Sequence, residues 1–197
     1  MKLVVGLGNP GVEYIWTRHN AGQIILSYFV EKLCLGTPKN NFQGDYWDAF
    51  VEGQKVAFLF PHTFMNLSGV SVAEAVNFYK LRAEDILVIS DDVALTFGRI
   101  RMRKSGSAGG QKGLASILGV LGTFDVCRLR IGIGTPLAPA GTKINLASWV
   151  LGKFPEEERE NFASISSACY DVLKLWLRGD VDIAMNRANS HRNEKTN

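Results

Sequence analysis

The sequence predicts an α/β protein of one domain, a three-layer sandwich in which a mixed, mostly parallel, twisted sheet carries helices on both faces. Short apolar runs alternate along the chain with segments whose apolar residues recur at helical spacing, as in strands joined by crossover helices. The 197 residues, 46% of them hydrophobic, are enough for one core and few for two. We expect residues 1–189 to form the domain and residues 190–197 to form a frayed tail.

The first expected elements are a strand, a helix and a hairpin. Residues 2–7 are a largely apolar run, typical of a buried strand, and residues 21–35 repeat apolar side chains at helical spacing. Residues 43–52 and 55–60 predict two adjacent strands that turn at Gly53. The loop between the first strand and the first helix is therefore long.

The remaining elements continue the same alternation. A helix is expected over residues 70–80, with Asn66 or Ser68 as its cap. A short buried strand over residues 86–89 leads to Asp91. The elements expected after it are a strand at 99–103, a glycine-rich loop at 105–113, a helix at 114–121, a strand at 128–133 and helices at 155–177 and 181–188.

Composition favours a soluble, cytoplasmic protein. The N-terminal apolar run reaches Gly6 before a signal-peptide core could form, and no apolar stretch approaches the ~20 residues that span a bilayer. Cys34, Cys127 and Cys169 lack the paired spacing of a zinc or redox site. We therefore expect three buried, reduced thiols and no metal.

The basic residues are concentrated in one segment. Residues 99–130 contain seven Lys or Arg residues and one Asp, a net charge of +6 in a chain whose total is +3, so that the rest sums to −3. Arg99, Arg101 and Arg103 alternate along an expected strand and would form a basic row on one face. The row leads into a glycine-rich loop that bears Lys112 at a helix start. Phosphate binding is favoured, and an edge strand protected by charge is the alternative.

The loop at residues 6–11 satisfies the pattern GxGxxG directly after a strand. Dinucleotide binding is not favoured, because Pro10 lacks the backbone N–H that a phosphate would need and the helix begins about ten residues later. The glycines are better explained by a tight exit from the strand. We therefore expect no cofactor.

A histidine and an aspartate follow the carboxyl ends of two expected strands, where open α/β sheets place their sites. Asp91 could accept a hydrogen bond from one imidazole nitrogen of His19 and leave the other nitrogen to take a proton. No GxSxG nucleophile motif accompanies the pair, so water is the simplest nucleophile. For Asp91, a solvated turn, a helix cap and a magnesium ligand are the alternatives.

Two asparagines lie where they could contact a ligand. Asn9 occupies the sharp turn of the glycine loop and could bond either its own backbone or a ligand. Asn66 follows Phe64 and Met65 just before a helix. Core packing would explain the aromatic ring and the thioether, but Asn66 could cap the helix or bind a substrate carbonyl or base edge.

Five motifs in this order resemble those of bacterial peptidyl-tRNA hydrolases, over about residues 1–152. They are the loop at 6–11 followed by Tyr14, Thr17-Arg18-His19-Asn20, Thr63-Phe64-Met65-Asn66-Leu67-Ser68-Gly69, Asp91, and Arg128-Leu129-Arg130-Ile131-Gly132-Ile133-Gly134.

The resemblance implies a metal-independent, monomeric hydrolase that cuts the ester bond of peptidyl-tRNA and so recycles tRNA from prematurely released chains. In the family, the residue matching His19 activates a water, the residue matching Asp91 keeps that histidine basic, and the residue matching Asn9 senses a blocked α-amino group. The resemblance also implies residues that bind the 3′ end, the tRNA 5′ phosphate and the adjoining tRNA surface. With the loop residues Met65 and Lys112 added, the expected substrate-binding set is Tyr14, Phe64, Met65, Asn66, Lys112, Arg103 and Arg130.

This chain departs from the family at four positions. Gln111-Lys112-Gly113 stands where the family usually has His-Asn-Gly, Asp92 replaces a glutamate, and Ala94 stands where an aspartate is common. A charged lysine cannot accept a hydrogen bond, although it can donate to an oxyanion or a phosphate. Two rival functions are a non-catalytic RNA-binding protein of the same fold and a dinucleotide oxidoreductase. The joint presence of His19, Asp91, Asn9 and Asn66 argues against the first.

Overall fold

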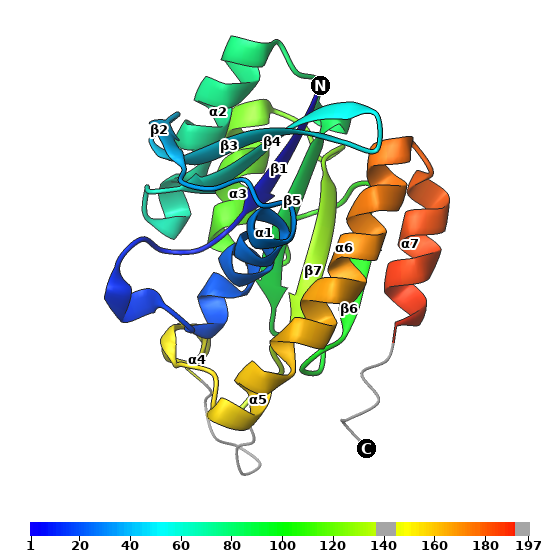
Figure 1. The fold of residues 1–197 in the computed structure, drawn as a ribbon. Coiled ribbons are helices and arrows are strands. Elements are labelled where there is room, and N and C mark those ends of the chain that lie inside the picture. Colours follow the sequence, from blue (N-terminus) through cyan, green and yellow to red (C-terminus); the bar gives the residue numbers. More distant parts are fainter. Residues whose placement is uncertain (137–144, 192–197) are drawn as a thin grey trace.

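A seven-stranded sheet in the order β2-β3-β4-β1-β5-β7-β6 forms the centre of the molecule (Figure 1). The computed structural model describes residues 1–136 and 145–191. The four central strands, β4, β1, β5 and β7, run parallel, and the strands at both edges pair antiparallel. The strands are β1 (Lys2–Gly6), β2 (Lys39–Asn41), β3 (Gly44–Val51), β4 (Gln54–Pro61), β5 (Ile86–Asp92), β6 (Ile100–Arg103) and β7 (Cys127–Gly132).

Helices cover both faces of the sheet and confirm the expected three-layer α/β sandwich. One core cluster joins the sheet to helices α1 and α6 and to the short helix α7, and a second joins the opposite face to α2 and α3. The α-helices are α1 (Ala21–Lys32), α2 (Ser68–Tyr79), α3 (Lys112–Leu121), α4 (Leu146–Leu151), α5 (Glu156–Glu160), α6 (Phe162–Arg178) and α7 (Val181–Ser190). The part of the chain that the structure describes also has the 3-10 helices η1 (Val12–Tyr14), η2 (Arg18–Asn20), η3 (Met65–Leu67) and η4 (Ala83–Asp85).

The first turn of α1 packs directly on the sheet at Gly22. A Cβ at this position would overlap the carbonyl oxygen of Ile89 and the backbone of Leu7, so only glycine permits this approach. The amide of Gln23 donates to the carbonyl of Leu7 at 3.0 Å. This packing places η2, which directly precedes α1, beside the carboxyl ends of β1 and β5.

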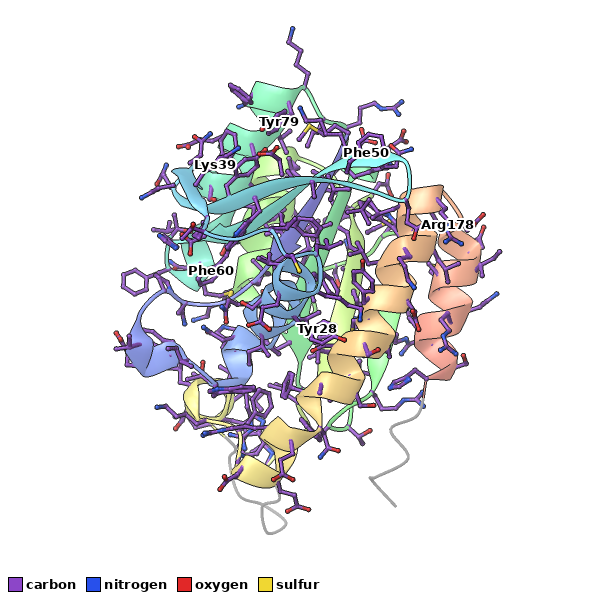
Figure 2. All side chains as sticks on the ribbon, viewed as in Figure 1. Tyr28, Lys39, Phe50, Phe60, Tyr79 and Arg178 are labelled. Carbon is purple, nitrogen blue, oxygen red and sulfur yellow. The ribbon has the colours of Figure 1, made fainter. Side chains whose placement is uncertain are left out.

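A hydrogen bond joins the β3–β4 hairpin to the C-terminal end of α6. Figure 2 shows Arg178 at the end of that helix, beside the part of the hairpin that carries Phe50. The Nε of Arg178 donates to Glu52 Oε2 at 2.8 Å. The hydrogen bond lies at the end of the helix remote from α5, so the hairpin is anchored away from the carboxyl ends of the parallel strands.

Several predicted boundaries need correction. The expected helix over residues 155–177 is two helices, α5 and α6, because the chain turns at Asn161 between them. Strand β5 extends to Asp92 rather than ending at residue 89. The helix α4 and the strand β2 were not expected. The C-terminal helix continues through Ser190, and residues 192–197 of the expected tail lie outside the described residues.

Two local predictions are wrong. Neither Asn66 nor Ser68 caps α2, because Leu67 occupies the cap position and Ser68 is the first helical residue, where its hydroxyl donates to the carbonyl of Met65. Cys34 is exposed rather than buried, because it follows the end of α1 in a left-handed backbone conformation; Cys127 and Cys169 are buried as expected. No helix within residues 1–136 and 145–191 is long and apolar enough to cross a membrane.

Candidate active site

A pocket of about 590 Å³ lies at the carboxyl ends of the parallel strands. Its walls come from the loop after β1, η2, η3, the end of β5, the glycine-rich loop before α3, and α4, which Figure 1 shows at this end of the sheet. The pocket is lined by most of the residues that the sequence predicted for the site: Asn9, His19, Phe64, Met65, Asn66, Asp91, Lys112 and Arg130.

The imidazole of His19 faces the carboxylate of Asp91. Its Nδ1 lies 3.0 Å from both carboxylate oxygens, and the two residues are 9% and 4% exposed. An ionised carboxylate can only accept hydrogen bonds, so the proton of a neutral imidazole resides on Nδ1 and the lone pair on Nε2. Because His19 lines the pocket, Nε2 is the ring nitrogen that can take a proton from a bound water.

The side chain of Asn9 has a defined orientation. Its Oδ1 accepts from the amide of Met65 at 2.9 Å, so its Nδ2 is the group left to donate into the pocket. The backbone of Asn9 is held at both its amide and its carbonyl by the side chain of Asn20, at 2.9 and 3.0 Å. The residue after His19 therefore fixes the position of Asn9.

A side chain outside the predicted set completes this arrangement. Gln111 donates from Nε2 to Asp91 Oδ1 at 3.0 Å, and the same Nε2 lies 3.2 Å from the sulfur of Met65. A series of contacts thus runs from His19 through Asp91, Gln111, Met65 and Asn9 to Asn20, the residue that follows His19 in the chain. The sequence signalled only that Gln111 precedes a helix.

One wall of the pocket is apolar. Helix α4 contributes Leu146, Ala147, Val150 and Leu151, and Phe64, which also lines the pocket, exposes 59% of its surface. The sequence contains one signal for α4, because Asn145 precedes an apolar run and asparagine is a common helix cap. In the structure its side chain accepts a hydrogen bond from the amide of Ser148. An exposed aromatic ring beside an apolar wall can stack on a base or pack against an apolar side chain.

The basic residues of segment 99–130 differ in whether they are free to bind a substrate anion. Arg130 lines the pocket and forms an ion pair with Asp92 at 2.7 Å. Lys112 is exposed at the pocket and, in the part of the chain that the structure describes, makes no ion pair. Lys112 is therefore the cation at the pocket that a substrate anion can reach without breaking a pair.

Arg128 does not contribute to a phosphate-binding row. It is 2% exposed and donates to the backbone carbonyls of Gly106, Ser107, Phe124 and Val126. Burial lowers the pKa of this guanidinium, with the charge of Arg130 acting in the same direction. Its role is to hold the glycine-rich loop against β7.

The expected basic row is shorter than the sequence suggested. Arg99 precedes β6 and donates to the carbonyl of Asn189 on α7. Arg101 and Arg103 are exposed, and Arg101 pairs in register with Arg130 on β7. Residues opposite one another in an antiparallel pair share a face, so the two arginines continue the face on which Arg130 lies.

Two predicted residues lie outside the pocket lining. Arg103 is on that exposed face, and Tyr14 is half-buried in η1, where its carbonyl accepts from the amide and hydroxyl of Thr17. Within the described residues, no three His, Cys, Asp or Glu side chains cluster as metal ligands.

Comparison with known proteins decides the family. The family model described as Peptidyl-tRNA hydrolase matches residues 3–196. The chain belongs to the peptidyl-tRNA hydrolase family. A family member from Rhodopirellula baltica is 46% identical over 190 residues, which cover 96% of this chain and 98% of the relative, and one from Clostridium perfringens is 41% identical over 189 residues, covering 96% and 97%.

A solved family structure, the peptidyl-tRNA hydrolase of Acinetobacter baumannii, superimposes with a TM-score of 0.89 at 37% identity and covers 98% of this chain and 96% of its own. The family match extends beyond residue 152, where the recognised motifs end. The C-terminal helices α5, α6 and α7 are therefore part of the family fold.

Proposed function

We propose that this pocket hydrolyses the ester bond of peptidyl-tRNA with a water that His19 activates. The contact between Asp91 and Nδ1 of His19, a residue that lines the pocket, is the observation that carries the proposal. A buried carboxylate that accepts from one imidazole nitrogen keeps the other nitrogen in its basic form. The reaction is the one for which the family is named.

The steps follow from these positions. The water oxygen attacks the ester carbonyl carbon while its proton passes to His19 Nε2. The carbonyl oxygen becomes an oxyanion, to which Asn9 Nδ2 and the ammonium of Lys112 can donate. Collapse breaks the bond to the ribose oxygen of the tRNA, which takes the proton back from the imidazolium. Peptide acid and free tRNA leave, and the histidine is neutral again.

The two sides of the pocket suit the two halves of the substrate. The apolar wall of α4 can receive peptide side chains, while Phe64 and Asn66 can stack on and hydrogen-bond to the bases of the 3′ end. Arg130, Arg101 and Arg103 then lead away from the pocket along one face of the sheet. A row of cations beginning at a site for the 3′ end suits the phosphates of the adjoining tRNA, including the 5′ phosphate.

The proposal also includes the oligomeric state and the cellular location of the enzyme. We take the monomer as the functional unit. We place the protein in the cytoplasm, where translation supplies peptidyl-tRNA. A non-catalytic RNA-binding role is not favoured, because it would not require a buried imidazole–carboxylate pair in the pocket.

The decisive experiment is a turnover assay on N-blocked aminoacyl-tRNA with a chelator present. The wild-type protein should release the blocked amino acid and should act poorly on free aminoacyl-tRNA. His19→Ala should lose nearly all turnover, whereas His62→Ala, which removes a histidine paired with Asp45 outside the pocket lining, should retain it. Wild-type turnover by His19→Ala would refute the general base, and loss of activity with the chelator would favour a metal mechanism. RNA binding without turnover would restore the rival function.

A further inference from the structure

The side chain of Gln111 connects the start of α3 to the His19–Asp91 pair. Gln111 is the N-cap residue of α3, and its Oε1 accepts from the amide of Leu114 at 2.6 Å. Its Nε2 donates to Asp91 Oδ1 at 3.0 Å. The residue is 9% exposed, so one small amide makes both contacts inside the protein.

The helix determines which end of this amide faces Asp91. Only the oxygen of the amide can accept from the Leu114 N–H, and only the nitrogen can donate to a carboxylate. The reversed orientation would place N–H against N–H at the helix and oxygen against oxygen at Asp91. Capping of α3 therefore directs a donor at the carboxylate.

Asp91 is consequently held from two sides. Its Oδ1 accepts from Gln111, and both of its oxygens lie 3.0 Å from His19 Nδ1. A carboxylate with a second donor cannot rotate without losing a hydrogen bond.

We propose that Gln111 is a positioning residue for the hydrolysis: it holds the carboxylate of Asp91 in the rotation in which it faces His19 Nδ1, so that His19 presents its other nitrogen to the water. The inference rests on the proposed general-base role of His19. The amide of Gln111 carries its N–H donor at every pH. In this chain the support of Asp91 does not titrate.

Gln111→Glu separates this role from capping. The new carboxylate can still accept from Leu114 and cap α3, but when ionised it cannot donate to Asp91 and repels it. At high pH, kcat should fall by roughly tenfold to a hundredfold, the size expected for losing a hydrogen bond to a charged group, with KM within about twofold. When the two carboxyl groups share a proton, the donor returns.

The pH profile is the main readout. Relative to wild type, the kcat of Gln111→Glu should recover as the pH falls from about 8 to about 5.5, because the shared proton restores donation to Asp91. Gln111→Ser keeps a capping oxygen but is too short to reach Asp91, so it should lose kcat without recovery at low pH. Gln54→Glu, the same change at the β3–β4 turn outside the pocket lining, should leave kcat and the profile unchanged.

The outcomes distinguish the proposals. A wild-type kcat and a wild-type pH profile for Gln111→Glu would overturn the positioning role. Losses of kcat that are equal at all pH values and accompany a lower unfolding midpoint would also overturn it. If Gln111→Glu does not fold, unchanged kcat in Gln111→Ser overturns the role and a fall in kcat at constant KM supports it. Retained turnover in His19→Ala overturns instead the general base on which the inference rests.

Discussion

The guanidinium of Arg18 stacks 3.6 Å from the ring centroid of Trp149. Arg18 directly precedes His19, and Trp149 belongs to α4, which forms the apolar wall of the pocket. The amide of Arg18 also donates to the carbonyl of Gly152 at 2.9 Å. Arg18 therefore joins the segment that carries the proposed base to the helix that forms the apolar wall, next to the hydrogen bond from the amide of Phe154 to the carbonyl of Trp16.

Replacing Arg18 should loosen both sides of the pocket. Arg18→Met keeps the packing of the stem but removes the cation and leaves Glu158, whose pKa burial already raises, without its partner. We expect a loss of about 1–3 kcal/mol in the free energy of unfolding by urea denaturation, and a several-fold fall in kcat/KM. Lys174→Met removes a cation that is stacked on Tyr170 and paired with Asp171 outside the pocket lining, so it should leave kcat/KM unchanged; an equal fall in kcat/KM for the two variants would refute the link.

Asn9→Asp should separate substrate contact from loop structure. The carboxylate retains an acceptor for the amide of Met65 but has no N–H to donate. We expect kcat/KM on N-blocked substrate to fall by about tenfold or more, with little change in the unfolding midpoint. The preference over free aminoacyl-tRNA should narrow, because a carboxylate attracts a free α-ammonium. Asn77→Asp, on the exposed surface of α2, is the matched control, and undiminished turnover by Asn9→Asp would exclude the contact.

Lys112→Asn restores the side chain usual in the family at this position. Because Lys112 is exposed and tunes at most one hydrogen bond, we expect a change of about tenfold or less in kcat. Steady-state kinetics beside Lys55→Asn, on β4 and outside the pocket lining, would measure it. A loss as large as that of His19→Ala would show instead that a catalytic duty resides on the lysine.

Arg103→Gln should weaken binding of full-length tRNA without affecting the chemistry. Loss of one phosphate contact should raise KM several-fold and reduce the salt dependence of binding by about one unit of slope, with kcat unchanged. A short 3′-terminal fragment lacks the stem that this face would bind, so its KM should not change. Lys55→Gln is the control, and an equal rise in KM for the fragment would place Arg103 at the pocket instead.

Most of the fold followed from local patterns. The apolar runs at β1, β4 and β5 and the helical spacing in α1 reflect which successive side chains are buried. A short stretch of sequence is enough to show this pattern, because it involves only residues that are neighbours in the chain. Helix α4 was missed because its six residues are too few for a periodic pattern. The expected cap of α2 was wrong because η3 precedes the helix and places Leu67 at the cap.

The recognised motifs predicted the site residues, but not all of their contacts. His19 and Asp91 were expected to meet because both follow strands that end at one edge of the sheet, and their nitrogen and oxygen atoms lie 3.0 Å apart. Arg128 was counted with the basic surface because charge along a chain does not reveal burial. Its guanidinium is directed inward because four backbone carbonyls in the adjoining loop and turn need donors.

The sequence by itself determined the α/β class, the family motifs and the chemical identity of the reacting groups, because these depend on residue type and local order. Only the tertiary structure decided which cations face solvent, that α4 closes the pocket, and that Gln111 reaches both Leu114 and Asp91. Such contacts join segments far apart in the chain, and their geometry depends on how helices pack on the sheet. In the sequence Gln111 is only a polar residue before a helix, because its two hydrogen-bond partners are brought to it by folding.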